Sequence, residues 1–213
     1  MKHKKRLSFS IKFTVVICSL LLVINAVLGV VLLSQSGNSM ETLIRNHMTA
    51  VSSTAASLID GDVLASFTEE DVGTEAYQKI SDLLITVKNV QKDADIKYIY
   101  IIKKVDEGFV FIVDPDPENP ADFGEEIVYT PEQEKAWEGT PQVDAEATED
   151  EWGCYYSAWS PITDSSGKVV AIVGMDFAAD WYNSQVASHT RSVVLISCLS
   201  LLAGGTVMLI LSS

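Results

Sequence analysis

The chain has 213 residues and a formal net charge of −14 at pH 7, with 15 basic and 29 acidic residues. This length allows one domain and two membrane spans. A negative field of this size repels nucleic acid and anionic lipid headgroups, which argues against both as partners of the domain. It agrees with a solvated acidic surface and mildly favours cationic or zwitterionic ligands.

Two apolar runs without charge lie near the ends of the chain, at residues 13–33 and 192–211. About 20 apolar residues in a helix cross a hydrocarbon core of about 30 Å, so both runs predict transmembrane helices. The basic start also suits a signal peptide. The first run is longer than a signal-peptide core and no A-x-A cleavage site follows it, so an uncleaved anchor is favoured.

Charge predicts the orientation in the plasma membrane. Residues 1–12 hold five Lys or Arg and no acid, so by the positive-inside rule this end is cytoplasmic. The chain then crosses outward at residues 13–33 and returns at 192–211, which leaves 212–213 as a cytoplasmic end. All 29 acidic residues fall within the extracytoplasmic segment 34–191, which has ten basic residues and so carries a charge of −19.

The first part of this segment has helical periodicity. Apolar residues recur at spacings of three and four from residue 34 to about 67, interrupted by a turn at Asp60-Gly61-Asp62. A second helix is predicted over residues 74–94, with Thr74 as its N-cap. A short helix is expected at 131–137, with Thr130 as cap and Pro131 at its first position.

The rest of the segment alternates like β-structure. Residues 97–102, 109–113, 153–162 and 169–177 predict four strands, the first pair and the last pair each joined by a tight turn. Residues 114–123 contain three prolines and are expected to be irregular, and 139–151 to be an acidic loop. Helices followed by antiparallel strands predict an α+β fold.

The three cysteines give no disulfide framework. Cys18 and Cys198 lie in the two spans, near opposite membrane faces, and Cys154 is the only cysteine of the outer segment. We expect Cys154 to be a buried free thiol in a strand, in preference to an intermolecular disulfide.

Four segments occur in an order that resembles a known family: ASLIDGDVL (56–64), KYIYII (97–102), FIVDPDPE (111–118) and YYSAWSPITDSSGKVVAIVGMDF (155–177). Together they resemble the extracytoplasmic Cache domains, PAS-like sensors of bacterial transmembrane receptors. The resemblance covers about residues 35–190, and its last segment is the most specific.

This resemblance implies a long N-terminal helix on a curved antiparallel sheet, flanked by two membrane helices. It also implies a homodimer and a cytoplasmic output module such as a diguanylate cyclase, a histidine kinase or a chemotaxis transducer. The sequence stops at Ser213, so we expect either a truncated receptor or one that signals through a partner. Any enzyme activity would lie beyond residue 213.

The outer segment lacks the motifs of a catalytic site. It has no G-x-S-x-G, H-E-x-x-H or phosphate-binding loop, and its two histidines lie far from the strands in sequence. We therefore predict no catalytic residue and no cofactor. The acids of 114–125 roughly match a calcium loop, but Asn119 replaces the required glycine and two prolines stiffen the stretch, so a solvated loop is favoured.

Ligand binding is the better-supported chemistry. An acid at the end of an apolar strand is costly to bury unless it is paired or holds a cation, which singles out Asp176. The Cache resemblance implies that an Asp in this G-x-D segment holds a ligand amino group, as in an amino acid or an amine. Aromatic and acidic residues of the strands and the short helix are candidate walls or hydrogen-bonding groups: Tyr100, Asp114, Trp137, Tyr156 and Trp159. The alternative for each is an ordinary core or turn position.

Two functions from different classes remain open at this stage. The leading interpretation is a membrane-bound sensor module that binds a small ligand and signals across the membrane. The alternative is a membrane-tethered adaptor or structural protein with a degenerate domain that binds no ligand.

Overall fold

The computed structural model describes residues 9–150 and 153–212. Within them the chain forms two compact units. One comprises residues 9–42 and 184–212, which are entirely helical, and the other is the α+β unit Leu43–Asn183. The predicted fold class, helices with an antiparallel sheet, is confirmed.

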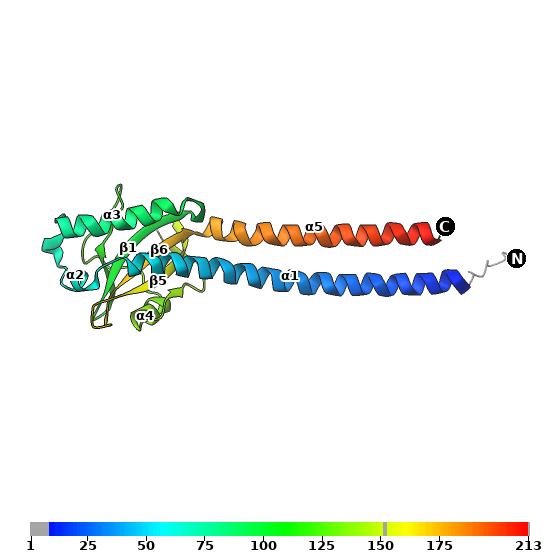
Figure 1. Cartoon of the computed structure of the whole chain (residues 1–213), viewed down its shortest axis with the longest axis horizontal. Helices are drawn as coiled ribbons and strands as arrows, with labels where there is room; N and C mark the ends of the chain where they lie inside the picture. Colours follow the sequence, from blue (N-terminus) through cyan, green and yellow to red (C-terminus); the bar gives the residue numbers. More distant parts are fainter. Residues whose placement is uncertain (1–8, 151–152, 213) are drawn as a thin grey trace. The chain divides into compact units, whose positions relative to one another are not determined.

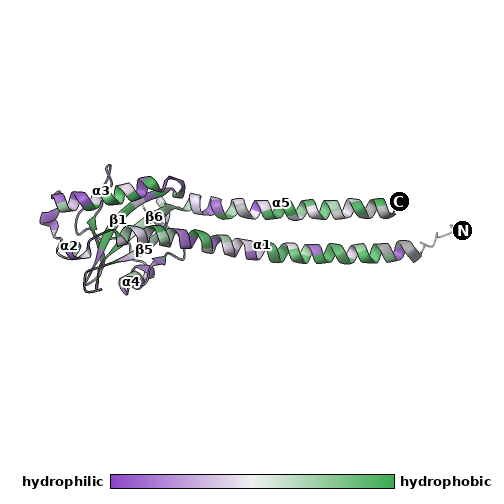
Figure 2. Cartoon of the chain, viewed as in Figure 1, coloured by the Kyte–Doolittle hydropathy of each residue, from purple (hydrophilic) through white to green (hydrophobic). Residues whose placement is uncertain are grey.

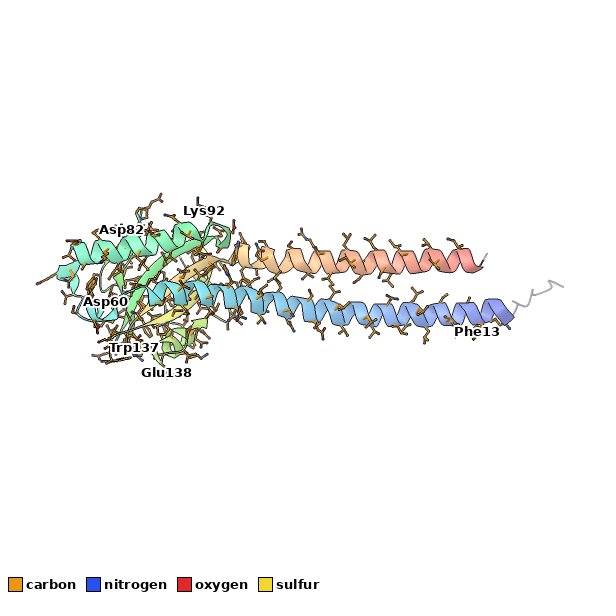
Figure 3. All side chains as sticks on the ribbon, in the orientation of Figure 1. Phe13, Asp60, Asp82, Lys92, Trp137 and Glu138 are labelled. Carbon is orange, nitrogen blue, oxygen red and sulfur yellow. The ribbon has the colours of Figure 1, made fainter. Side chains whose placement is uncertain are left out.

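The helical unit is formed by parts of α1 (Phe9–Ser57) and α5 (Ala179–Ser212). Stretches of both helices, Val15–Ser57 and Ala179–Val207, are long and apolar enough to cross a membrane, and each overlaps most of one of the two predicted runs. Figure 2 shows apolar residues along most of α5 and along the N-terminal part of α1. Their large apolar side chains are exposed, as on Phe13, which is labelled in Figure 3.

The second unit is built on one antiparallel sheet with the strand order β2-β1-β6-β5-β3. Its central strands are β1 (Ile96–Val105), β6 (Val169–Ala178) and β5 (Gly153–Thr163), with β2 (Gly108–Val113) at one edge. All ten residues of β6 are buried or half-buried, because both faces of this strand are covered. Figure 1 shows β1, β6 and β5 beside the C-terminal part of α1.

Helices cover both faces of this sheet. On one face, Ser52 and Ser53 of α1 hydrogen-bond Ser160 of β5, at 2.8 and 3.0 Å. On the opposite face, Ala136 of α4 (Pro131–Trp137) packs in a cluster with Tyr100 and Trp159. Successive residues of a strand point to opposite faces, so Ser160 contacts α1 on one face of the sheet and Trp159 packs with α4 on the other.

The predicted cap at Thr74 is confirmed: its side chain accepts a hydrogen bond from the N–H of Tyr77 at the start of α3 (Glu75–Val90). Asp60, the first residue of the predicted turn, caps the short helix α2 (Gly61–Ala65). A Cβ on Gly61 would overlap the carbonyl group of Thr163, so this position has room only for glycine. The predicted helix 74–94 is interrupted: a 3-10 turn, Lys92–Ala94, follows α3, and Asp95 has a φ of 44°.

Two expectations for the outer segment are wrong. The acidic stretch 139–151 is not only loop, because β3 (Gln142–Val143) and β4 (Thr148–Asp150) pair antiparallel with β5. Such short strands carry no periodicity of their own and exist because β5 offers them an edge. Cys154 is exposed rather than buried, since it lies on a face of β5 that is open to solvent at that end of the strand.

Candidate functional site

A cavity of about 550 Å³ lies on the α4 face of the sheet. Its floor consists of residues from β1, β6 and β5, and its walls come from the irregular segment after β2 and from the residues around β3 and β4. The residues that line it are Tyr98, Tyr100, Phe111, Asp114, Asn119, Pro120, Ala121, Asp122, Glu125, Glu126, Ile127, Val128, Thr130, Asp144, Thr148, Tyr155, Ser157, Trp159 and Asp176.

Strand register brings the floor residues together. Gly174 of β6 pairs with Tyr100 of β1 on one side and with Trp159 of β5 on the other. A Cβ on Gly174 would lie 2.8 Å from Trp159 Cζ3 and closer still to the Tyr100 ring. The missing side chain therefore lets the two rings meet over β6, with centroids 6.2 Å apart and planes at 60°.

Asp176 forms the first polar centre of the cavity. It is 8% exposed, and the hydroxyl of Tyr100 donates to its Oδ1 over 3.0 Å. Burial, followed by the negative charge of Asp176, raises the pKa of Tyr100 well above its usual value. Tyr100 thus keeps its proton and acts as a donor.

Asp144, which directly follows β3, forms the second polar centre. Its Oδ1 accepts hydrogen bonds from Trp159 Nε1 at 2.6 Å and from Thr130 Oγ1 at 3.3 Å. Its Oδ2 is buried and has no hydrogen-bond partner among the residues that the structure describes. The side chain is 2% exposed, and this burial raises the pKa of Asp144 to about 6 despite the two donors.

The backbone of Asp144 is held from the opposite direction by Arg45 of α1. Arg45 donates through Nη1 to the carbonyl oxygen of Asp144 at 2.9 Å and through Nη2 to that of Val143 at 2.7 Å. The guanidinium group thus contacts the carbonyl groups of this segment, and Asp144 is also one of the residues that line the cavity.

Asp114 organises the wall instead of offering free oxygens. Its two carboxyl oxygens accept the N–H groups of Asp116 at 3.0 Å and of Ala121 at 2.9 Å, which closes the proline-containing loop around it. Burial raises the pKa of Asp114, and these two hydrogen bonds partly offset the effect. Asp116 in turn accepts the N–H groups of Glu118 and Asn119.

Acidic and aromatic side chains predominate in the lining of the cavity. Six of the described lining residues are Asp or Glu and five are aromatic, whereas none is Lys, Arg or His. The aromatic rings meet edge to face, Tyr98 on Tyr155 at 5.5 Å and Tyr100 on Phe111 at 5.0 Å. Negative charge beside aromatic rings is an environment for an organic cation. A second cavity of about 270 Å³ has no charged side chain in its lining.

The structure brings four of the six sequence-predicted residues to this cavity: Tyr100, Asp114, Trp159 and Asp176. Tyr156 instead stacks on Tyr182 at 4.1 Å, on the opposite face of β5. Trp137, labelled beside Glu138 in Figure 3, packs against Phe109 at 6.2 Å and is not among the lining residues.

Sequence reasoning missed Asp144, Tyr155 and Ser157. Strand alternation from Trp159 could have found Tyr155 and Ser157, because residues two and four positions away share its face. No local signal marks Asp144, which is one of several acids in a short stretch.

No family model matches the chain, and no curated protein matches it. Three solved structures illustrate what it is similar to. The Escherichia coli DcuS sensor domain is 16% identical, covers 70% of this chain and 98% of its own, and has a TM-score of 0.47. The periplasmic sensory domain of the Campylobacter jejuni chemoreceptor Tlp1 is 12% identical, covers 72% of this chain and 61% of its own, and has a TM-score of 0.48.

The third is the ligand-binding domain of the Campylobacter jejuni chemoreceptor Tlp3 in complex with L-valine. It is 11% identical, with a TM-score of 0.40 over 71% of this chain and 66% of its own. The chain thus spans less than two thirds of each chemoreceptor domain. All three are described as sensor or ligand-binding domains, and no function of this chain follows from likenesses at these identities and TM-scores.

Proposed function

We propose that this chain is the input module of a membrane receptor, whose Leu43–Asn183 unit lies outside the cytoplasm and binds a small organic cation in the 550 Å³ cavity. One observation supports this most directly: buried carboxyl groups and aromatic rings line the cavity, and no basic residue is among its described lining residues. Among the described residues, Asp144 Oδ2 is a buried carboxyl oxygen without a hydrogen-bond partner, which is costly, and a bound cation would relieve that cost.

Asp176 is the proposed anchor for a protonated amine. It is buried on the floor of the cavity, and Tyr100 donates to one of its oxygens, which keeps the carboxylate in place. An ammonium group has three donors and no acceptor, so it suits a carboxylate surrounded by aromatic faces.

The same geometry supports a route for the signal. Asp176 lies near the end of β6, and α5 begins directly after β6, at Ala179. Arg45 connects α1 to the carbonyl groups of Val143 and Asp144. We propose that a ligand held by these acids shifts the balance between two arrangements of α1 and α5, in proportion to its differential affinity for them. A cytoplasmic module or partner would receive that shift, in a homodimer of the chain.

Ligand binding is tested with the full chain in detergent micelles. We expect some members of a panel of amines to raise the unfolding temperature, and the Asp176→Ala variant to lose this stabilisation. Glu107→Gln, in the exposed turn between β1 and β2, removes one negative charge away from the cavity and is the matched control. Stabilisation that persists in Asp176→Ala would remove this residue from the site. If no amine, amino acid or carboxylate stabilises the chain, the adaptor function becomes the better account.

A further inference from the structure

The two polar centres of the cavity lie at the two ends of one aromatic pair. Tyr100 connects to Asp176 through its hydroxyl group, and Trp159 connects to Asp144 through its indole N–H. The two rings contact each other edge to face between these ends. A ligand that lies along this pair would therefore have a carboxyl group at either end and aromatic carbon in between.

Asp144 is the end that most needs a ligand. Its side chain is 98% buried, it lines the cavity, and its Oδ2 has no hydrogen-bond partner among the described residues. Most buried polar atoms in proteins are hydrogen-bonded, and an unsatisfied carboxylate oxygen costs more than a neutral group. Neither Trp159 nor Thr130 donates a hydrogen bond to Oδ2, because both donate to Oδ1.

The lining also has little to offer a ligand carboxylate. None of the described lining residues is basic. Loop N–H groups could take the place of a basic side chain, but those of Asp116 and Ala121 are already bound to Asp114, and those of Glu118 and Asn119 to Asp116. A zwitterionic amino acid would place its carboxylate among acids.

From this arrangement we infer that the ligand is a dication without a carboxylate, a diamine whose two ammonium groups bind Asp176 and Asp144 while its methylene chain crosses the Tyr100–Trp159 pair. This inference rests on the proposed function and specifies its ligand class. The cavity volume of about 550 Å³ lies within the usual range for small-molecule sites, roughly 300–1,000 Å³.

Three probes of equal chain length separate the possibilities: 1,4-diaminobutane, butylamine and 4-aminobutanoate. They carry two ammonium groups, one ammonium group, and one ammonium group with one carboxylate. Isothermal titration of the full chain in nanodiscs at pH 7.5 should give about tenfold or tighter binding of the diamine relative to butylamine, since one charge-assisted hydrogen bond is lost. We expect 4-aminobutanoate to bind most weakly.

Two variants locate the two ends. Asp144→Asn should abolish the preference for the diamine over butylamine, and its circular dichroism spectrum and cooperative thermal unfolding show that this variant is folded. Asp176→Asn should weaken both amines. Glu107→Gln again controls for net charge.

The outcomes distinguish the inference from the proposed function. If butylamine or 4-aminobutanoate binds as tightly as the diamine, or if Asp144→Asn leaves the preference for the diamine unchanged, the diamine inference is overturned while amine binding stands. If none of the three probes binds and no other amine stabilises the chain, the proposed function itself fails.

Discussion

Trp159 donates its indole N–H to Asp144 Oδ1 over 2.6 Å, which fixes the orientation of a carboxyl group whose second oxygen is buried and has no hydrogen-bond partner among the described residues. The contact joins the floor of the sheet to the residue directly after β3, so the shape of the cavity and the position of its most buried acid depend on each other.

Asp144 should make the stability of the domain depend on pH. Its pKa in the folded chain is raised from 3.8 to about 6, chiefly by burial, with Glu132 of α4 adding to the effect and Trp159 and Thr130 opposing it. The unfolded chain therefore loses this proton first, and the free energy of unfolding falls as pH rises from about 4 to about 6. The loss is on the order of 3 kcal/mol at most.

The Asp144→Asn variant should lack this component. Denaturation of both proteins from pH 4 to 8, followed by tryptophan fluorescence, should give a flatter profile for the variant, which becomes the more stable protein above about pH 6 in the absence of ligand. The contribution of Asp114 is common to both proteins, so the difference between the profiles isolates Asp144. Parallel profiles would contradict the burial of a titrating carboxyl group here.

Gly174→Ala should damage the floor of the cavity. A methyl group at this position would overlap the Tyr100 ring and lie 2.8 Å from Trp159 Cζ3, so the rings must separate. Overpacking of this kind typically costs roughly 1–3 kcal/mol, and we expect a lower unfolding temperature together with weaker amine binding. Gly37→Ala in α1 has open space around the added methyl group and should be neutral or slightly stabilising. Equal behaviour of the two variants would contradict the close contact of the rings.

Arg45→Met should lower stability and separate ligand binding from any response of α1. It removes two hydrogen bonds from a charged donor to the carbonyl groups of Val143 and Asp144 but keeps an apolar side chain of similar length. We expect a loss of roughly 1–3 kcal/mol in thermal denaturation. Leu43 of α1 is exposed and can carry a spin label. The electron paramagnetic resonance spectrum of this label should change on amine binding in the parent protein and stay unchanged in Arg45→Met. An equal shift in both would exclude this contact as the connection.

Cys154 provides a test of topology because its side chain is exposed. If residues 34–191 lie outside the cytoplasm, a membrane-impermeant maleimide should label intact cells that express the chain, and Cys154→Ser should abolish the labelling. A cysteine placed at Ser8 in the Cys154→Ser background should react only after the cells are lysed. Labelling at Ser8 in intact cells would reverse the predicted orientation.

Much of the fold could be predicted because local chemistry determines it. Thr74 and Thr130 mark helix starts through their caps, and alternation over β1, β5 and β6 is long enough to identify strands. By contrast, β3 and β4 have two and three residues and form only because β5 accepts them. Pairing of that kind depends on the tertiary structure, and the sequence carries no local record of it.

The residues of the candidate site also differ in whether the local sequence marks them. Asp176 was predictable because it places an acid at the end of an apolar strand, and Tyr100 because it is an aromatic residue of a strand that could form a wall or a hydrogen bond. The face of β5 was also determined by parity, since Tyr156 and Trp159 are an odd number of residues apart and must point to opposite faces. Asp144 was out of reach because its burial arises from β3, from Trp159 and from the residues before α4, which meet only in the folded chain.

Arg45 binds main-chain atoms of residues 143 and 144, so the contact with α1 does not depend on the side chains of these two residues. Asp144 lines the cavity and in our proposal contacts the ligand through its side chain, whereas the carbonyl groups of residues 143 and 144 accept hydrogen bonds from Arg45 of α1. Every amino acid has a carbonyl group, so a substitution at position 144 can change the preferred ligand without removing the contact with the helix. Related proteins with other residues at position 144 could therefore bind other ligands and keep the same hydrogen bonds between this segment and α1.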